Sequence, residues 1–306
     1  MSWADRLHEA VHRVGNPCMV GLDPHLDLLP DEFAVARDPQ APRRDRAQAL
    51  SDFCWEMLDL CAGTVAVVKP QSAFFELFGA DGVEAWETVV TRAHEAGLLV
   101  LGDVKRGDIA STAKAYATAF LQGVPGTDPA PLCDAVTVNP YLGDDAVEPF
   151  LEACRESGTG IYVLVRTSNA GGTRFQLHGE PALSHLVADA VSRWGEGLMG
   201  ECGFSSVGAV VGATHADELA DFRARMPHTP FLLPGFGAQG ASAHDTLGAF
   251  SRGGLGGALI ASSRGVSFAY RSERYAGKSW KDAAAASLHD MIAEVTSALA
   301  TVQAGG

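Results

Sequence analysis

Residues Leu98–Thr112 read LLVLGDVKRGDIAST and contain the most informative pattern of the chain. The stretch opens with an apolar run, Leu98–Leu101, and then places three charged side chains close together: Asp103, Lys105 and Asp108. Because the side chains of a strand alternate between its two faces, Asp103 and Lys105 are predicted to project to the same side. Two carboxylates and one ammonium group are therefore expected to converge where a buried strand reaches solvent.

These charges also have a purely structural interpretation. Asp108 is well placed to be the N-cap of the helical pattern Ile109–Gln122, accepting hydrogen bonds from backbone N–H groups that the helix leaves unpaired. Lys105 would then serve only as the ion-pair partner of Asp103. The stretch by itself leaves the structural and the catalytic interpretations equally open, so the rest of the chain has to decide between them.

The length and composition of the chain indicate one large folded unit. With 306 residues, it has a length that α/β barrels commonly reach as one domain, so we expect a single domain over residues 1–306. Hydrophobic residues make up 47%, which is enough to fill a large core. No segment approaches the run of about 18 apolar residues that a membrane span requires. The charged, amphipathic N-terminus does not resemble a signal peptide, so we expect a cytoplasmic protein with no membrane partner.

Charge and cysteine usage narrow the class of partners further. The net charge of −14 disfavours binding to nucleic acid, although a local basic cluster can still hold a small anionic substrate. The ten histidines show no HExxH spacing and the cysteines no CxxC pair, so no metal site or disulfide framework is predicted. The six cysteines are expected to be buried free thiols: Cys18, Cys54, Cys61, Cys133, Cys154 and Cys202.

Eight apolar runs alternate with helical patterns along the chain, and their continuity is typical of parallel strands covered on both faces. The predicted strands are Cys18–Leu22, Val65–Val68, Leu98–Leu101, Ala135–Val138, Ile161–Val165, Val207–Val211, Pro230–Leu233 and Leu255–Ala261. The predicted helices are an amphipathic one within residues 1–15 and segments 44–62, 82–96, 109–122, 144–157, 183–199, 215–226, 242–251 and 280–300. We therefore predict a single α/β (β/α)8 TIM barrel with an N-terminal helix and a long C-terminal helix. A doubly wound open sheet is the alternative.

Polar or glycine residues recur where the predicted strands end. They are Asp23, Lys69, Asp103, Asn139, Ser168, Thr214, Gly235 and Arg264. In an eight-stranded α/β barrel the carboxyl ends of the strands form the active-site face. We therefore expect these residues to surround one site.

The loops after the last two strands favour a phosphate site. Gly235–Gly240 reads GFGAQG and matches the GxGxxG pattern of dinucleotide-binding folds. Such a fold needs an acidic residue at the end of the next strand, but no acidic residue lies between Asp245 and Glu273. That strand ends instead near Arg264, whose guanidinium group can bind a phosphate approached by glycine backbone N–H groups. Tight turns with a surface arginine remain the structural alternative.

Several motifs together make the chain resemble the orotidine 5′-phosphate decarboxylase family, in its longer bacterial (type 2) branch. The similarity runs from GLDPH (Gly21–His25) to SSRG (Ser262–Gly265). Its most specific parts are VVKPQSAFFE (Val67–Glu76), DVKRGDI (Asp103–Ile109), NPYLG (Asn139–Gly143), RTSN (Arg166–Asn169) and PGFGAQG (Pro234–Gly240). The DxKxxD element is only moderately specific alone, whereas all five motifs in this order are strongly specific.

The resemblance implies the conversion of orotidine 5′-phosphate (OMP) to UMP and CO₂, the last step of de novo UMP biosynthesis, without metal or cofactor. It implies a catalytic charge array of Lys69, Asp103, Lys105 and Asp108, in which Lys105 protonates C6 of the ring. It also implies a homodimer in which Asp108 enters the partner's site together with Ile109 and Thr112.

The resemblance further implies the residues that bind the substrate. Asp23 and Lys69 are expected to contact the ribose, and Ser168 the pyrimidine. Gln239 and Arg264 are expected to bind the phosphate. Three further residues of the same two loops complete the predicted substrate-binding set: Gly235, Gly237 and Ser263.

Some features depart from the family or stay without a role. Ala170 stands where many relatives carry a proline, and loops 24–43 and 171–182 have no assigned function. Keto-gulonate-phosphate decarboxylases share DxKxxD but use magnesium and carry a glutamate in place of Lys69, which argues against that alternative. A non-catalytic phosphate-sensing barrel is the other alternative, but it would not need the whole charge array.

Overall fold

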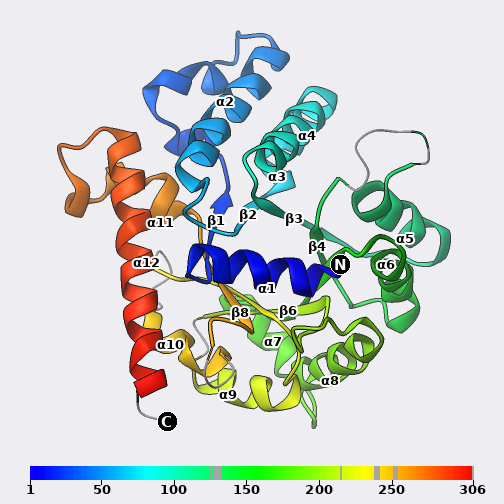
Figure 1. Cartoon of the computed structure of the whole chain (residues 1–306). Helices are drawn as coiled ribbons and strands as arrows, with labels where there is room; N and C mark the ends of the chain where they lie inside the picture. Colours follow the sequence, from blue (N-terminus) through cyan, green and yellow to red (C-terminus); the bar gives the residue numbers. More distant parts are fainter. Residues whose placement is uncertain (125, 127–131, 214–215, 238–241, 251–253, 305–306) are drawn as a thin grey trace.

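The computed structural model describes residues 1–124, 126, 132–213, 216–237, 242–250 and 254–304, and its centre is a closed barrel (Figure 1). Eight parallel strands follow one another in sequence order around the barrel, and the first pairs with the last. They are β1 (Cys18–Leu22), β2 (Val67–Pro70), β3 (Leu99–Arg106), β4 (Ala135–Val138), β5 (Gly160–Arg166), β6 (Val207–Val211), β7 (Phe231–Pro234) and β8 (Ala258–Ser262). The predicted (β/α)8 fold is confirmed, and the open-sheet alternative is wrong.

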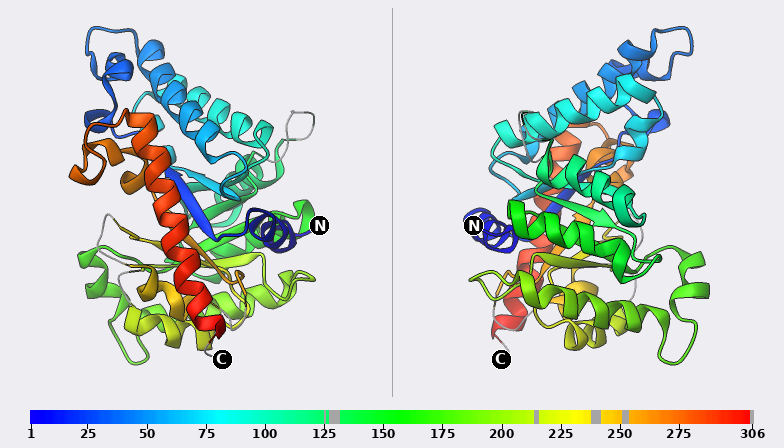
Figure 2. Two further views of the ribbon diagram at one scale, coloured as in Figure 1. Left: turned by 60° about the vertical axis from the view of Figure 1, so that its left-hand side comes forward. Right: turned by 90° about the vertical axis from the view of Figure 1, so that its right-hand side faces the viewer.

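Helices surround the barrel as the alternation predicted. They are α1 (Trp3–Val14), α2 (Arg43–Cys61), α3 (Ser72–Glu76), α4 (Gly79–Glu95), α5 (Ala110–Ala117), α6 (Asp144–Ser157), α7 (Thr173–Gln176), α8 (Leu183–Gly195), α9 (Ala216–Arg225), α10 (Ala243–Thr246), α11 (Arg264–Ser267) and α12 (Trp280–Ala304). The long C-terminal helix α12 runs along the side of the barrel, and α1 lies across one end of it (Figure 2). Both predicted terminal helices are therefore present.

The N-terminal helix closes the amino end of the barrel. Its apolar residues recur at helical spacing as Trp3, Leu7 and Val11, and they pack against the side chains that fill the barrel interior. Trp3 is completely buried, and its ring meets that of Tyr162 edge to face with centroids 6.3 Å apart. With this end sealed, the carboxyl end of the barrel is left for a ligand.

The segment around β3 differs from the prediction in two ways. β3 continues beyond the apolar run to Arg106, and its pairing with β4 shifts between Gly102 and Arg106. Asp108 is not the N-cap of α5, because Ile109 holds that position and the helix begins one residue later than predicted. Ala110, the first residue of α5, has a left-handed φ of 48°. The Asp108 carboxylate instead accepts a hydrogen bond from the Ile109 N–H at 2.8 Å.

Other differences concern short elements. The loop over residues 24–43 contains two 3₁₀ segments, 26–28 and 31–37, and the short helix α3 was not predicted. The predicted helix 109–122 ends in a π-helical turn, and β8 is shorter at its start than predicted. The first residue of predicted helix 215–226 and the last of 242–251 lie outside the described residues, as does Thr214.

The six cysteines are all free, and five of them are buried, while Cys202 is half-buried because it lies in a turn before β6. Within the described part of the chain, no helix combines the length and the apolar character needed to cross a bilayer.

Candidate active site

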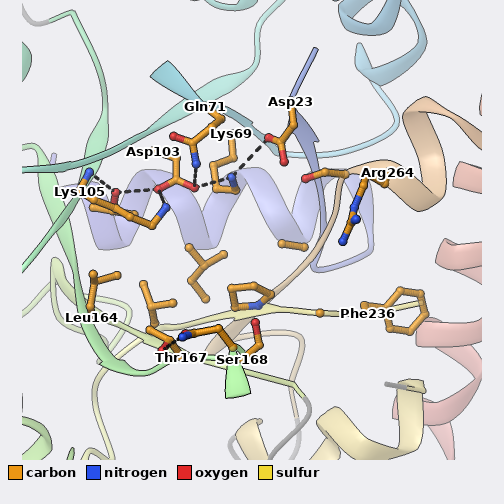
Figure 3. Close-up of a pocket in the computed structure, with 18 residues that line it drawn as sticks. Asp23, Lys69, Gln71, Asp103, Lys105, Leu164, Thr167, Ser168, Phe236 and Arg264 are labelled. Carbon is orange, nitrogen blue, oxygen red and sulfur yellow. Dashed lines mark hydrogen bonds and ion pairs between the residues drawn. The ribbon is translucent and has the colours of Figure 1, made fainter. Parts of the chain in front are cut away.

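A cavity of about 310 Å³ opens at the carboxyl ends of the strands, and its lining is drawn in Figure 3. Eight of the predicted site residues line it: Asp23, Lys69, Asp103, Lys105, Ser168, Gly235, Ser263 and Arg264. They come from positions at or just after the ends of six different strands. Residues far apart in the sequence thus meet because parallel strands deliver their last side chains to one face.

The Asp103 carboxylate is the centre of this site, and four donors engage it. Its Oδ2 atom accepts hydrogen bonds from Lys69 Nζ at 2.7 Å and from Gln71 Nε2 at 2.9 Å. Its Oδ1 atom accepts from Lys105 Nζ at 2.5 Å and from Thr137 Oγ1 at 2.9 Å. The carboxylate is therefore fixed in position by groups from three neighbouring strands, β2 to β4, and the residue after β2 (Figure 3).

These contacts decide the charge of the array. Burial alone would raise the pKa of Asp103, but the ammonium groups of Lys69 and Lys105 outweigh it and hold that pKa well below its usual range. Burial alone would lower the pKa of Lys69, but Asp103 and Asp23 outweigh it, so the net pKa is raised. At neutral pH the centre of the pocket is therefore an ionised carboxylate between two lysines, of which Lys105 is the more exposed.

Asp23 offers an acceptor that the protein leaves unused. Its Oδ1 atom is buried, lies 3.8 Å from Lys69 Nζ, and has no hydrogen-bond donor among the described residues. The strand end is crowded here: a Cβ atom on Gly21 would lie only 1.9 Å from the Oγ atom of Ser263. A glycine at this position lets the ends of β1 and β8 approach closely, which brings Asp23 and Ser263 to the same side of the pocket.

The end of the pocket opposite Lys105 is cationic. Arg264 and Phe236 lie there, as Figure 3 shows, and Gly235 lines the same end with a φ of 108° that favours glycine. Arg264 begins α11 directly after β8. Two charged groups, the Arg264 guanidinium and the Lys105 ammonium, therefore stand at opposite ends of one cavity.

The wall facing the charge array comes from the loop after β5, which carries Ser168 and Thr167. Gln176 of α7 fastens this loop, because its Nε2 donates to Thr167 Oγ1 at 2.7 Å and its Oε1 accepts from the Thr167 N–H at 3.0 Å. Part of the segment 171–182, to which the sequence assigned no role, thus supports a wall of the pocket.

The three predicted residues that follow β3 do not line this pocket: Asp108 is half-buried, Ile109 is 51% exposed, and Thr112 is exposed. They lie between the end of β3 and the first turn of α5, and their exposure leaves them accessible to another molecule. Gly237 is described, with a φ of 69°, but is not part of the lining. Gln239 lies outside the described residues.

The sequence interpretation missed Gln71 and Thr137, which both donate to Asp103. A signal for each was present. Gln71 comes two residues after Lys69, so strand alternation places the two on one face. Thr137 is the polar residue in the otherwise apolar strand Ala135–Val138. Among the described residues, no group of three or more histidine, cysteine, aspartate or glutamate side chains is arranged to hold a metal ion.

Comparison with known proteins gives a uniform result. Residues 19–278 match the family model described as "Orotidine 5'-phosphate decarboxylase / HUMPS family". The orotidine 5′-phosphate decarboxylase of Rhodopirellula baltica is 42% identical over 301 residues, which cover 95% of this chain and 98% of that protein. The protein of the same name from Deinococcus radiodurans is 47% identical over 240 residues, covering 78% and 84%. The solved structure of Leishmania donovani OMP decarboxylase has a TM-score of 0.74 and 32% identity, covering 98% of this chain and 99% of that one.

Proposed function

The chain belongs to the orotidine 5′-phosphate decarboxylase / HUMPS family, and from this membership we propose how its pocket performs the reaction. The activity is that of an orotidine 5′-phosphate decarboxylase, a carboxy-lyase of pyrimidine biosynthesis that converts OMP to UMP and CO₂. The assignment of roles to individual residues is our proposal. The observation that carries it is the ionised Asp103 carboxylate held between Lys69 and Lys105 inside the cavity.

The substrate lies in the pocket with its phosphate at Arg264 and its reacting carbon at Lys105. The guanidinium of Arg264, with Ser263 and the backbone of Gly235, binds the phosphate dianion, and Gln239 and Gly237 of the preceding loop join them. The cationic end of the cavity supports this orientation.

The ribose and the base occupy the middle of the cavity. The unused Oδ1 atom of Asp23 accepts a hydrogen bond from a ribose hydroxyl, and Lys69, 3.8 Å from that atom, contacts the ribose as well. Ser168, on the opposite wall, reads the pyrimidine edge.

Lys105 carries the chemistry. Loss of CO₂ leaves an electron pair on C6 of the pyrimidine, and the positive ammonium group of Lys105 stabilises that developing charge. The same group then transfers a proton to C6, which gives UMP and a neutral amine that solvent reprotonates. The side chain suits this task because it is anchored at Asp103 while still half exposed to the cavity.

Asp103 has two roles. Its fixed negative charge keeps Lys69 protonated and holds the side chain of Lys105 in place. It also lies where the carboxylate of OMP must approach, so repulsion between the two anions is relieved as neutral CO₂ leaves.

The functional unit is a homodimer in which Asp108 completes the partner's charge array. Asp108, Ile109 and Thr112 do not line the cavity of their own chain, and the exposed side chain of Ile109 offers an apolar contact. This placement supports insertion of the segment into a second site related by two-fold symmetry.

We also place the protein in the cytoplasm. The six cysteines remain free thiols, which is the state expected in a reducing compartment.

The reaction proceeds without a metal or cofactor. Each oxygen of Asp103 already accepts two hydrogen bonds, and the ammonium of Lys69 stands 2.7 Å from Oδ2, where a cation bound to this carboxylate would have to lie. The ammonium group of Lys69 therefore supplies the positive charge that magnesium supplies in the keto-gulonate-phosphate enzymes.

The test is the ultraviolet absorbance of OMP incubated with the protein in the presence and absence of a chelator. We expect the spectrum to convert to that of UMP at the same rate in both samples. An unchanged spectrum would contradict the decarboxylase assignment and favour a barrel that only binds phosphate esters. Turnover that stops with chelator would contradict the metal-free mechanism.

A further inference from the structure

Thr137 links the backbone of Lys105 to the carboxylate of Asp103. Its side chain is buried in β4, with the residue 1% exposed. The Thr137 Oγ1 atom accepts a hydrogen bond from the Lys105 backbone N–H at 2.9 Å and donates one to Asp103 Oδ1 at 2.9 Å. The direction of both bonds is fixed, because an amide N–H can only donate and an ionised carboxylate can only accept. The hydroxyl therefore acts as acceptor and donor at once, which the side chain of valine, similar in shape, cannot do.

The backbone of Lys105 needs such a contact. Its φ of 45° lies in the left-handed region, which is unfavourable for non-glycine residues and persists only where surrounding contacts hold it. Regular pairing between β3 and β4 is lost here, since Gly102 pairs with Val136 while Arg106 pairs with Val138. The N–H of Lys105 therefore bonds to a side chain, Thr137, in place of a strand carbonyl.

We propose that Thr137 is a positioning residue for the decarboxylation: it holds Lys105 in its left-handed conformation and aligns the Lys105 ammonium with Asp103. This inference rests on the proposed function, in which Lys105 protonates C6. Both hydrogen-bonding contacts of the Thr137 hydroxyl are made within the protein. Thr137 therefore acts through Lys105 and Asp103, so its loss should affect the chemical step more than substrate binding.

Gln71 provides a matched comparison. It also donates to Asp103, at 2.9 Å on the other carboxylate oxygen, but the Lys105 backbone N–H bonds to Thr137 and not to Gln71. A variant lacking the Gln71 amide therefore loses one donor to Asp103, whereas a variant lacking the Thr137 hydroxyl loses a donor and releases the backbone of the proton donor. If the position of the Lys105 backbone matters for catalysis, kcat must fall further in the variant that lacks the Thr137 hydroxyl than in the variant that lacks the Gln71 amide.

The experiment compares steady-state OMP turnover for Thr137→Val, Thr137→Ser, Gln71→Met and wild type, with UMP affinity measured by calorimetry. Thr137→Val keeps the shape but lacks the hydroxyl, so we expect kcat to fall by about 10- to 100-fold while KM and UMP affinity change less than about threefold. Thr137→Ser keeps the hydroxyl and should recover most of kcat. The decrease in kcat should be smaller for Gln71→Met than for Thr137→Val. Thr229→Val, a buried threonine before β7 at the other end of the barrel, should leave kcat unchanged.

Two results overturn the inference: a kcat for Thr137→Val within about twofold of wild type, or an equal loss of kcat in Thr137→Ser and Thr137→Val. If Thr137→Val does not fold, Thr137→Ala takes its place under the same criteria.

The Lys105→Ala variant is assayed alongside, to separate this inference from the proposed function. If it turns over OMP like wild type, the proton-donor role fails and the inference with it. If it is inactive while Thr137→Val is fully active, the inference alone fails.

Discussion

The Nζ atom of Lys69 lies 2.7 Å from the Oδ2 atom of Asp103, and both residues are almost fully buried, with 5% and 6% of their surface exposed. A buried ion pair is stable only where each charge is compensated, and removing one partner leaves the other charge unpaired in a medium of low polarity. The pair is therefore part of the structure of the barrel mouth as well as part of the proposed catalytic array.

Replacing Asp103 with asparagine should cost both stability and activity. Lys69 would then keep only Asp23 as a carboxylate partner, at 3.8 Å, so we expect the free energy of unfolding to fall by about 3–5 kcal/mol. Urea denaturation at pH 7 measures this loss. Asp31→Asn is the control, because the exposed side chain of Asp31 pairs with Arg37 at the surface and should contribute less than about 1 kcal/mol. Equal stability of Asp103→Asn and wild type would show that the buried pair is not needed for folding.

Gly21→Ala should weaken substrate binding through Ser263. The added Cβ atom would lie 1.9 Å from Oγ and 2.9 Å from Cβ of Ser263, so the segment that also carries Arg264 has to shift. We expect KM for OMP to rise by about tenfold or more, equivalent to about 1.4 kcal/mol of binding free energy. Steady-state kinetics measures the effect.

The matched control for this prediction is the double variant Gly21→Ala/Ser263→Gly, in which the colliding side chain is absent. Its KM should be no higher than that of Ser263→Gly alone, which is the non-additivity expected of two residues in contact. Two results would refute the steric argument. One is a KM for Gly21→Ala equal to that of wild type. The other is a double variant whose rise in KM equals the product of the rises in the two single variants.

Asp134 should make stability depend on pH without affecting catalysis. This buried carboxylate precedes β4 at the amino end of the barrel, where it accepts hydrogen bonds from His94 and the Val100 N–H and pairs with Arg6. Burial alone would raise the pKa of Asp134, but these three partners outweigh it and lower that pKa. Because the pKa is lower in the folded state than in the unfolded state, the stabilisation is complete at neutral pH and is lost as the pH falls below about 4.

Asp134→Asn should therefore unfold at a lower temperature than wild type at pH 7, and the difference should shrink between about pH 4 and pH 2.5. Thermal denaturation followed by circular dichroism across this range checks the prediction, and kcat at pH 7 should stay at the wild-type value. A difference in Tm that grows on acidification would contradict the sign of the pKa shift.

Sharing of the site between subunits predicts complementation. In a mixed dimer, the Asp108→Ala chain supplies an intact Lys105, and the Lys105→Ala chain supplies an intact Asp108, so one of the two sites is complete. Random mixing in equal amounts should restore about one quarter of wild-type activity from two inactive parents. Activity after mixing, with mixed dimers verified by mass spectrometry of differently tagged chains, is the measurement. Mixed dimers that form but remain inactive would place Asp108 in the site of its own chain, or outside any site.

The fold was predictable from the sequence because the two patterns that indicate it, apolar runs and the polar residues after them, each span only a few residues. Continuous apolar runs predict strands buried on both faces, and polar residues after them predict the functional end of the barrel. Helix α6 even has the predicted limits, Asp144–Ser157, since its apolar spacing is regular and Gly158 ends it in a left-handed conformation. The grouping of Asp23, Lys69 and Asp103 in one pocket follows from the same topology.

The details of the site were not predictable in the same way. The left-handed conformations of Lys105 and Ala110 carry no glycine signal in the sequence, and that of Lys105 is supported by a hydrogen bond to the neighbouring strand. Thr137 looks like a normal β-branched strand residue until its two hydrogen bonds are seen. The N-cap expectation for Asp108 was wrong as well, since Ile109 holds that position and α5 begins at the left-handed residue Ala110.

Delivery of the proton from Lys105 to C6 of the substrate is tested with the Lys105→Ala variant. We expect OMP turnover, followed by ultraviolet absorbance, to fall by more than about 10,000-fold. UMP binding, measured by calorimetry, should stay readily detectable, because the contacts expected from Arg264, Asp23 and Ser168 are intact. A variant that binds UMP and still decarboxylates OMP at a rate near that of wild type would show that Lys105 is not the proton donor.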